Sequence, residues 1–199
     1  MKKTLTSVLA ALLFFSFTPS PELPIGADIP KGYIYMKDIG GNDISLYNAT
    51  QANGLLVIFS ANTCPYIKWS EKPLSLACEY ALKNEIGVVM VNSNETEHKG
   101  NESYGAMIKY AKYNGYRWYY VLDENATIAK AFQAQRTPEC FLFNKQGKLV
   151  YHGSLNDNPS NPAAVTREHL KIAMDELIGG KDISLKVTKS LGCTIKKLD

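Results

Sequence analysis

The sequence has few cysteines and lacks the patterns that mark repeats, linkers and metal sites. Its 199 residues include four cysteines and three histidines. Four cysteines are too few for a disulfide scaffold of this length. No internal repeat, charge block or low-complexity stretch is present, which favours one domain of ordinary size. The cysteine and histidine spacings of zinc sites are also absent, so we expect neither a metal nor a cofactor.

A hydrophobic run long enough to cross a membrane is missing as well. The chain begins Met1-Lys2-Lys3, continues with a largely apolar stretch over residues 5–17 and then turns polar and proline-bearing. This pattern is typical of a secretory signal peptide, and the run is shorter than the about 20 residues of a membrane span. We expect a signal peptide over residues 1–20 and a single domain with a C-terminal tail over residues 21–199. The protein would be periplasmic or extracellular, or membrane-tethered if the leader stays uncleaved.

An excess of charge of one sign is the third missing feature. The whole chain has 22 basic and 19 acidic residues. The leader carries Lys2 and Lys3 and no acids, so its removal leaves 20 basic against 19 acidic residues. We therefore expect no nucleic-acid partner. The sequence contains no pattern that fixes the oligomeric state.

What the chain does contain is an alternation of strand and helix patterns. Short apolar runs predict buried strands, and apolar residues at helical spacing predict amphipathic helices. The predicted elements are a glycine-turn β-hairpin over 33–47, strands at 55–59, 86–92, 117–122, 140–143 and 148–152, and helices at 65–84, 104–113, 126–133 and 163–178. Their order predicts an α/β sandwich with a mixed central sheet and an N-terminal β-hairpin.

The first buried strand leads directly to a cysteine. Cys64 follows the polar residues Asn62 and Thr63, and Pro65 after it is favourable at the first position of a helix. Free N–H groups and the positive end of the helix dipole favour a thiolate there. Burial would be unusual at such a polar turn. We therefore expect Cys64 to be a nucleophile.

The other three cysteines differ in their suitability as its partner. Cys78 lies on the apolar face of the same helix, about 20 Å further along, which is too far for a disulfide. Cys140 begins a buried strand and shares a face with Leu142, which favours a core role, but it could approach Cys64. Cys193 lies in a polar, flexible tail. Cys193 and Cys140 are equal candidates for the resolving thiol, and an external thiol is the third alternative.

Four segments of the chain carry a family resemblance. In order they are Phe59-Ser-Ala-Asn-Thr-Cys64-Pro-Tyr-Ile67, Arg136-Thr137-Pro138-Glu139, Lys148-Leu-Val-Tyr151-His-Gly153 and Gly192-Cys193-Thr-Ile-Lys196. Together these motifs resemble the thioredoxin fold and, more narrowly, the peroxiredoxin-like branch of the alkyl hydroperoxide reductase/thiol-specific antioxidant (redoxin) family. The resemblance extends over residues 33–197, almost the whole predicted domain.

This resemblance implies a thioredoxin-like α/β/α sandwich and an antioxidant or oxidoreductase function. It implies that Thr137 and a cis Pro138 lie next to the active cysteine. Arg136 either stabilises a thiolate or a peroxide oxygen, or is an ordinary surface arginine. The chain departs from the family at Ile67, where thioredoxin-type reductases have their second cysteine. It also departs at Ala61, where the peroxidases have threonine.

We accordingly expect an exported thiol oxidoreductase. Its substrate would be a disulfide-bearing protein or a small peroxide, and an external thiol would regenerate it. Ala61 argues against an efficient peroxidase, and Ile67 argues against a self-contained dithiol reductase. The alternative is a non-catalytic thioredoxin-fold binding module that carries copper or a peptide, since soft thiolates suit Cu(I).

Overall fold

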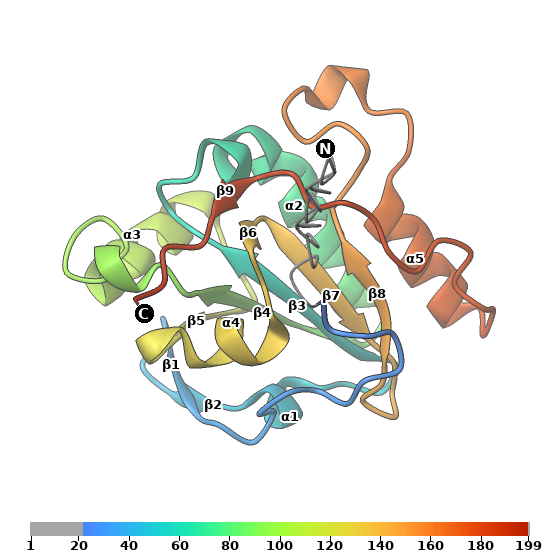
Figure 1. Ribbon diagram of the computed structural model, residues 1–199, viewed down its shortest axis with the longest axis horizontal. Helices are drawn as coiled ribbons and strands as arrows, with labels where there is room; N and C mark the ends of the chain where they lie inside the picture. The colour runs from blue at the N-terminus through green and yellow to red at the C-terminus, as the bar shows by residue number, and fades with distance from the viewer. Residues whose placement is uncertain (1–21, 199) are drawn as a thin grey trace, which may run out of the picture.

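The computed structural model describes residues 22–198, so the predicted signal peptide lies outside the described part. The main sheet contains β1 (Met36–Asp38), β2 (Asp43–Ile44), β3 (Gly54–Ser60), β4 (Ile86–Asn92), β5 (Tyr119–Leu122), β7 (Glu139–Phe143) and β8 (Leu149–Gly153). Their order is β2-β1-β5-β4-β3-β7-β8 (Figure 1). β3, β4 and β5 run parallel, and the other neighbours pair antiparallel. The predicted mixed sheet and N-terminal hairpin are therefore confirmed.

Helices cover both faces of this sheet (Figure 1). Side chains of α2 (Pro65–Lys83), α3 (Tyr104–Asn114) and α5 (His169–Ile178) form one apolar cluster with the sheet. α1 (Leu46–Ala49) and α4 (Thr127–Phe132) pack into a second cluster on the opposite face. Along β7 the alternation is as predicted, because Cys140 and Leu142 belong to the first cluster and Phe141 and Phe143 to the second. The fold is the predicted α/β/α sandwich.

The central strand β3 explains why its sequence is apolar without interruption. All seven of its residues are buried, with β4 on one side and β7 on the other. A strand covered on both faces has no side that requires polar residues. Its carboxyl end leads through the turn at residues 61–63 into α2, which places the start of that helix at one end of the sheet.

The second strand of the predicted hairpin is shorter than expected. The predicted hairpin extends to residue 47, but β2 ends at Ile44 and the chain turns into α1. The Ser45 hydroxyl accepts the backbone N–H of Asn48 at 3.2 Å, which is an N-terminal helix cap. This local hydrogen bond stabilises a helical turn that the apolar pattern did not indicate.

The last helix also begins later than predicted. The expected helix over 163–178 starts only at His169, after a 3-10 turn at Pro162–Ala164. The carboxylate of Asp157 accepts the backbone N–H of Thr166 at 3.0 Å. This hydrogen bond closes residues 157–166 into a loop, which delays the start of the helix.

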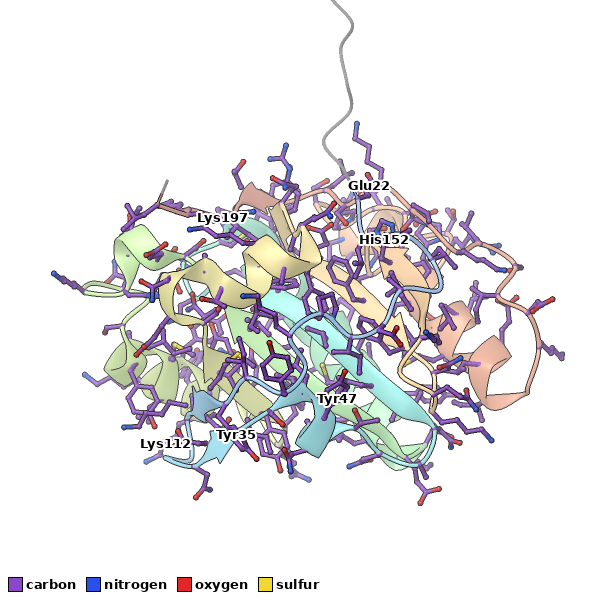
Figure 2. The ribbon with its side chains drawn as sticks, turned by 60° about the horizontal axis from the view of Figure 1, so that its bottom comes forward. Glu22, Tyr35, Tyr47, Lys112, His152 and Lys197 are labelled. Carbon is purple, nitrogen blue, oxygen red and sulfur yellow. The ribbon has the colours of Figure 1, made fainter. Side chains whose placement is uncertain are left out.

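The C-terminal tail is ordered by strand pairing, whereas the sequence predicted a flexible segment. β9 (Cys193–Thr194) pairs antiparallel with β6 (Arg136–Thr137). Figure 1 shows the red C-terminal segment passing from α5 across one end of the sheet to β9. Beyond β9, Lys197 reaches the carbonyl of Ala134 after α4 at 2.6 Å (Figure 2). Within residues 22–198, no helix has the length and apolar character needed to span a membrane.

Candidate redox site

Cys64 occupies the N-cap position of α2, with Pro65 at the first helical position. Its thiol donates a hydrogen bond to the Thr137 carbonyl oxygen at 3.0 Å. The peptide bond between Thr137 and Pro138 is cis. The folded chain therefore brings Cys64 next to Thr137, which lies 73 residues further along the sequence and directly before the cis Pro138.

Burial of Cys64 differs from the sequence expectation. The residue is only 3 % exposed, although it follows a polar turn. It belongs to the apolar cluster of the α2 face, and Cys193 of the tail packs against that same cluster. The tail thus contributes to burying a thiol that the local sequence alone would leave accessible.

Cys193 is the cysteine that lies beside Cys64. In the register of β6 and β9 it pairs with Thr137, whose carbonyl accepts the Cys64 thiol. Burial raises the pKa of Cys193, and the hydrogen bond and charge interaction with Cys64 raise it further, to about 11. The backbone N–H of Tyr66 has a smaller, opposite effect. Cys193 therefore keeps its proton at neutral pH.

Gly192 allows this approach of the tail. A Cβ atom at this position would lie 2.2 Å from the Thr137 carbonyl oxygen and 2.7 Å from its carbon. Such a contact is far inside the ordinary distance between non-bonded atoms, so a side chain would require the backbone to shift. A glycine directly before Cys193 thus lets β9 lie close against β6.

The two remaining cysteines are core residues. Cys78 and Cys140 are fully buried, and burial raises the pKa of both thiols. Cys140 pairs with Ile58 of β3 and lies near enough to Cys78 to raise its pKa. All four cysteines are free. Of the two candidate resolving thiols, the structure brings Cys193 to Cys64 and places Cys140 beside Cys78.

Arg136 interacts with the tail. Its guanidinium donates to the Thr194 hydroxyl at 2.8 Å, across the pairing of β6 and β9. Among the hydrogen bonds of the described residues, this guanidinium has none to Cys64. Lys68, one helical turn beyond Cys64, is exposed. The observed hydrogen bond thus places the Arg136 guanidinium against the tail.

Sequence reasoning missed a buried carboxylate beneath the turn that precedes Cys64. Glu102 is fully buried, and its oxygens accept hydrogen bonds from the backbone N–H groups of Asn62 and Thr63, both at 2.8 Å. The Thr63 hydroxyl and the Asn92 amide donate to it as well, at 2.5 and 2.8 Å. Glu102 stands in a polar loop before α3, where a glutamate is ordinarily solvated. Its sequence context gave no signal because its partners lie 10 to 40 residues away.

The site shows no arrangement for a metal ion. In the part of the chain that the structure describes, no three side chains of His, Cys, Asp or Glu are grouped so that they could hold one. Away from the cysteines, His152 and Glu22 lie next to each other at 3.7 Å (Figure 2). Burial lowers the pKa of His152, and the nearby Glu22 partly offsets this.

Comparisons with known proteins agree with this geometry. A family model described as redoxin matches residues 24–168. An uncharacterized conserved protein from Geobacillus kaustophilus is 30 % identical, with a TM-score of 0.81 over 88 % of this chain and 93 % of that one. A hypothetical protein from Sinorhizobium meliloti 1021 is also 30 % identical, with a TM-score of 0.81 over 90 % and 97 %.

A more distant structure shares the fold alone. The secreted Mycobacterium tuberculosis disulfide oxidoreductase homologous to E. coli DsbE is 14 % identical, with a TM-score of 0.51 over 73 % of this chain and 92 % of that one. None of the curated proteins matches this chain in sequence.

Proposed function

We propose that this chain, which belongs to the redoxin family and has the thioredoxin fold, is a thiol–disulfide oxidoreductase. Membership of this family supports thiol-based redox chemistry in general. Cys64 is the nucleophile and Cys193 the resolving thiol. The observation that carries this proposal is the pairing of β9 with β6, in which Cys193 stands opposite Thr137, the residue that accepts the Cys64 thiol.

The reaction proceeds in two exchanges. The Cys64 thiolate attacks one sulfur of a substrate disulfide, which forms a mixed disulfide and releases the other substrate sulfur as a thiolate. Cys193 then loses its proton and attacks the Cys64 sulfur, which releases the second substrate thiolate and leaves a Cys64–Cys193 disulfide. The two released thiolates each take up a proton. The substrate is thus reduced by two electrons while the protein dithiol is oxidised.

The different positions of the two thiols support this division of roles. Cys64 stands at the N-cap of α2, beside the Thr137 carbonyl. The pKa of Cys193 is raised to about 11 by burial and by the neighbouring Cys64, so this thiol stays protonated while Cys64 is free. Once Cys64 is in a mixed disulfide, its contribution to that pKa is removed and Cys193 ionises more readily.

A disulfide fits the surroundings of Cys64 better than a peroxide does. Reduction of a peroxide requires hydrogen-bond donors aimed at its oxygens, which stabilise the developing negative charge. The N–H groups of Asn62 and Thr63 are bound to Glu102, and so is the Thr63 hydroxyl. The guanidinium of Arg136 is bound to Thr194, and Ala61 has no hydroxyl.

The location and the reductant belong to the same proposal. The pattern of residues 1–20 supports export of a single domain. The substrate of this exported domain is a disulfide-bearing protein. An external thiol reduces the Cys64–Cys193 disulfide by the reverse exchanges, because the other two thiols, Cys78 and Cys140, are fully buried in the core.

Reduction of insulin disulfides by the protein, with dithiothreitol as the external thiol, tests this function. We expect Cys64→Ser to abolish the activity and Cys193→Ser to accumulate a mixed disulfide of Cys64. Cys140→Ser, which changes a buried thiol away from Cys64, is the matched control and should retain catalysis after correction for folded fraction. Equal activity of Cys193→Ser and wild type would overturn the role of Cys193. Faster consumption of hydrogen peroxide than of disulfide would overturn the choice of substrate.

A further inference from the structure

We propose that Glu102 is a positioning residue that holds both halves of the redox pair in register, the turn before Cys64 and the tail strand of Cys193. This inference rests on the proposed function of these two cysteines. It assigns a role to a carboxylate that touches neither sulfur and is fully buried.

The first half is the turn that presents Cys64. One oxygen of Glu102 accepts the backbone N–H of Asn62, and the other accepts the N–H of Thr63, each at 2.8 Å. These two amides immediately precede Cys64, so the carboxylate fixes the path by which the chain leaves β3 and enters α2. Asn62 is bound a second time, because its side-chain oxygen accepts the Tyr120 hydroxyl at 3.0 Å.

The second half is the tail, and buried asparagines connect it to Glu102. The side-chain NH₂ group of Asn92 donates to Glu102 at 2.8 Å. The side-chain oxygen of Asn92 accepts the backbone N–H of Asn94 at 3.2 Å. The Asn94 side chain then accepts the backbone N–H of Lys196 at 3.0 Å. Lys196 stands three residues after Cys193. Asn92, Asn94 and Glu102 are all buried.

Glu102 suits this task because it is an acceptor on both oxygens. Every one of its four partners is a donor. Each oxygen accepts two of these hydrogen bonds. Glutamine has nearly the same shape but replaces one oxygen by an NH₂ group, which would face two donor groups and lose at least one hydrogen bond. A buried donor without a partner is costly in free energy, which favours a shift of the surrounding segments that gives it another partner. Displacements of about 1 Å between reacting groups slow reactions by up to about 100-fold.

The lifetime of the mixed disulfide measures this positioning directly. Reduced protein is mixed with oxidised glutathione and quenched with acid, and mass spectrometry follows the Cys64–glutathione adduct and its conversion to the Cys64–Cys193 disulfide. We expect Glu102→Gln to slow that conversion about tenfold or more. The rate of the first step, the attack of Cys64 on oxidised glutathione, should fall less than the rate of conversion to the Cys64–Cys193 disulfide.

A second variant tests the tail half and does not depend on the folding of Glu102→Gln. Asn94→Ala loses the acceptor for the Lys196 N–H and should also slow the conversion to the Cys64–Cys193 disulfide. Asn94→Asp keeps an acceptor oxygen and should convert at the wild-type rate. Asp38→Asn is the matched control, because Asp38 is a buried carboxylate that binds the N–H groups of Gly40 and Tyr120. This variant should be destabilised but should close its disulfide at the wild-type rate.

The outcomes separate this inference from the proposed function. If wild-type protein closes the disulfide and both Glu102→Gln and Asn94→Ala close it at the same rate, the role of Glu102 is refuted and the function stands. If wild-type protein forms no Cys64–Cys193 disulfide, both are refuted. If Asp38→Asn slows closure as much as Glu102→Gln does, the effect is one of general stability and the inference fails.

Discussion

Among single residues, Thr137 connects the two parts of the site, because both Cys64 at the start of α2 and the tail strand β9 contact it. Its carbonyl oxygen accepts the Cys64 thiol at 3.0 Å, and the residue pairs with Cys193 across β6 and β9. Gly192 lies so close to this oxygen that no side chain fits between them. A change in the tail at this position therefore affects the cysteine of α2 directly.

Gly192→Ala should separate the two thiols. The new Cβ would lie 2.2 Å from the Thr137 oxygen, so the tail must move away, at a cost of roughly 1–3 kcal/mol in unfolding free energy. We expect slower disulfide closure and faster alkylation of Cys64 by iodoacetamide, since the tail helps to bury it. Gly105→Ala is the control, because a Cβ there meets no atom within 4 Å. Unchanged closure in Gly192→Ala would contradict the close approach described here.

The acidity of Cys193 should depend on Cys64. The neighbouring thiol is one cause of its pKa of about 11, after burial. Cys64→Ser removes part of this effect, so the pKa of Cys193 should fall while burial keeps it above the ordinary value. The pH dependence of Cys193 alkylation, followed by peptide mass spectrometry, measures this shift. An identical profile in wild type and variant would show that the two sulfurs do not interact.

Local sequence patterns were sufficient for some of these residues and insufficient for others. The core positions of Cys78 and Cys140 followed from helical and alternating periodicity, and both are fully buried. The position of Cys64 at the start of a helix followed from the proline after it. Glu102 escaped notice because its role comes from tertiary hydrogen bonds that no local pattern encodes.

At the scale of elements, length decided what could be predicted. The predicted bounds of β3, β4 and α2 lie within one or two residues of the observed ones. The two strands are uninterrupted apolar runs of several residues, and α2 is long enough to repeat its apolar face over several turns. β6 and β9 have two residues each. A strand of two residues has no periodicity, so its pairing becomes visible only in the folded chain.

Arg136 should act on this short pairing and leave the reactivity of Cys64 unchanged. Its guanidinium bonds Thr194 on the exposed side of the β6–β9 pair. We expect Arg136→Ala to cost roughly 0.5 kcal/mol locally and to speed exchange of the Ile195 amide, which donates to Gln135, about twofold. Lys68→Ala, another exposed cation, should leave this exchange unchanged. A large loss of Cys64 alkylation rate in Arg136→Ala would instead indicate that the guanidinium stabilises the thiolate.

In the molecule as a whole, the two apolar clusters on either side of the sheet stabilise the fold by burying apolar side chains, and they keep ionisable groups away from water. Cys78, Cys140 and Tyr120 are fully buried, and burial raises the pKa of each. The overall α/β/α arrangement was predictable because it follows from the order of long elements. The covering of Cys64 by the tail was not, because it depends on a pairing between distant short segments.

These buried groups predict a loss of stability in alkali. The pKa of each group is higher in the folded than in the unfolded state. The contribution of such a group to the unfolding free energy is therefore complete below its unfolded-state pKa, which is about 8.5 for cysteine. It is lost as the pH rises through the folded-state pKa. We expect the unfolding free energy of reduced protein to fall between pH 9 and 10 by about 1.4 kcal/mol for each fully buried thiol. Urea unfolding at several pH values measures this slope. Cys78→Ala should show a shallower slope, and a flat profile in wild type would contradict the burial of these thiols.

The proposed mechanism depends on the pairing of Cys64 with Cys193, which disulfide mapping detects. Reduced protein is oxidised with one equivalent of oxidised glutathione, the remaining thiols are alkylated at low pH, and the digested peptides are identified by mass spectrometry. We expect one disulfide, between Cys64 and Cys193, with Cys78 and Cys140 recovered as thiols. A disulfide between Cys64 and Cys140, or a Cys64–glutathione adduct that persists in wild-type protein, would contradict it.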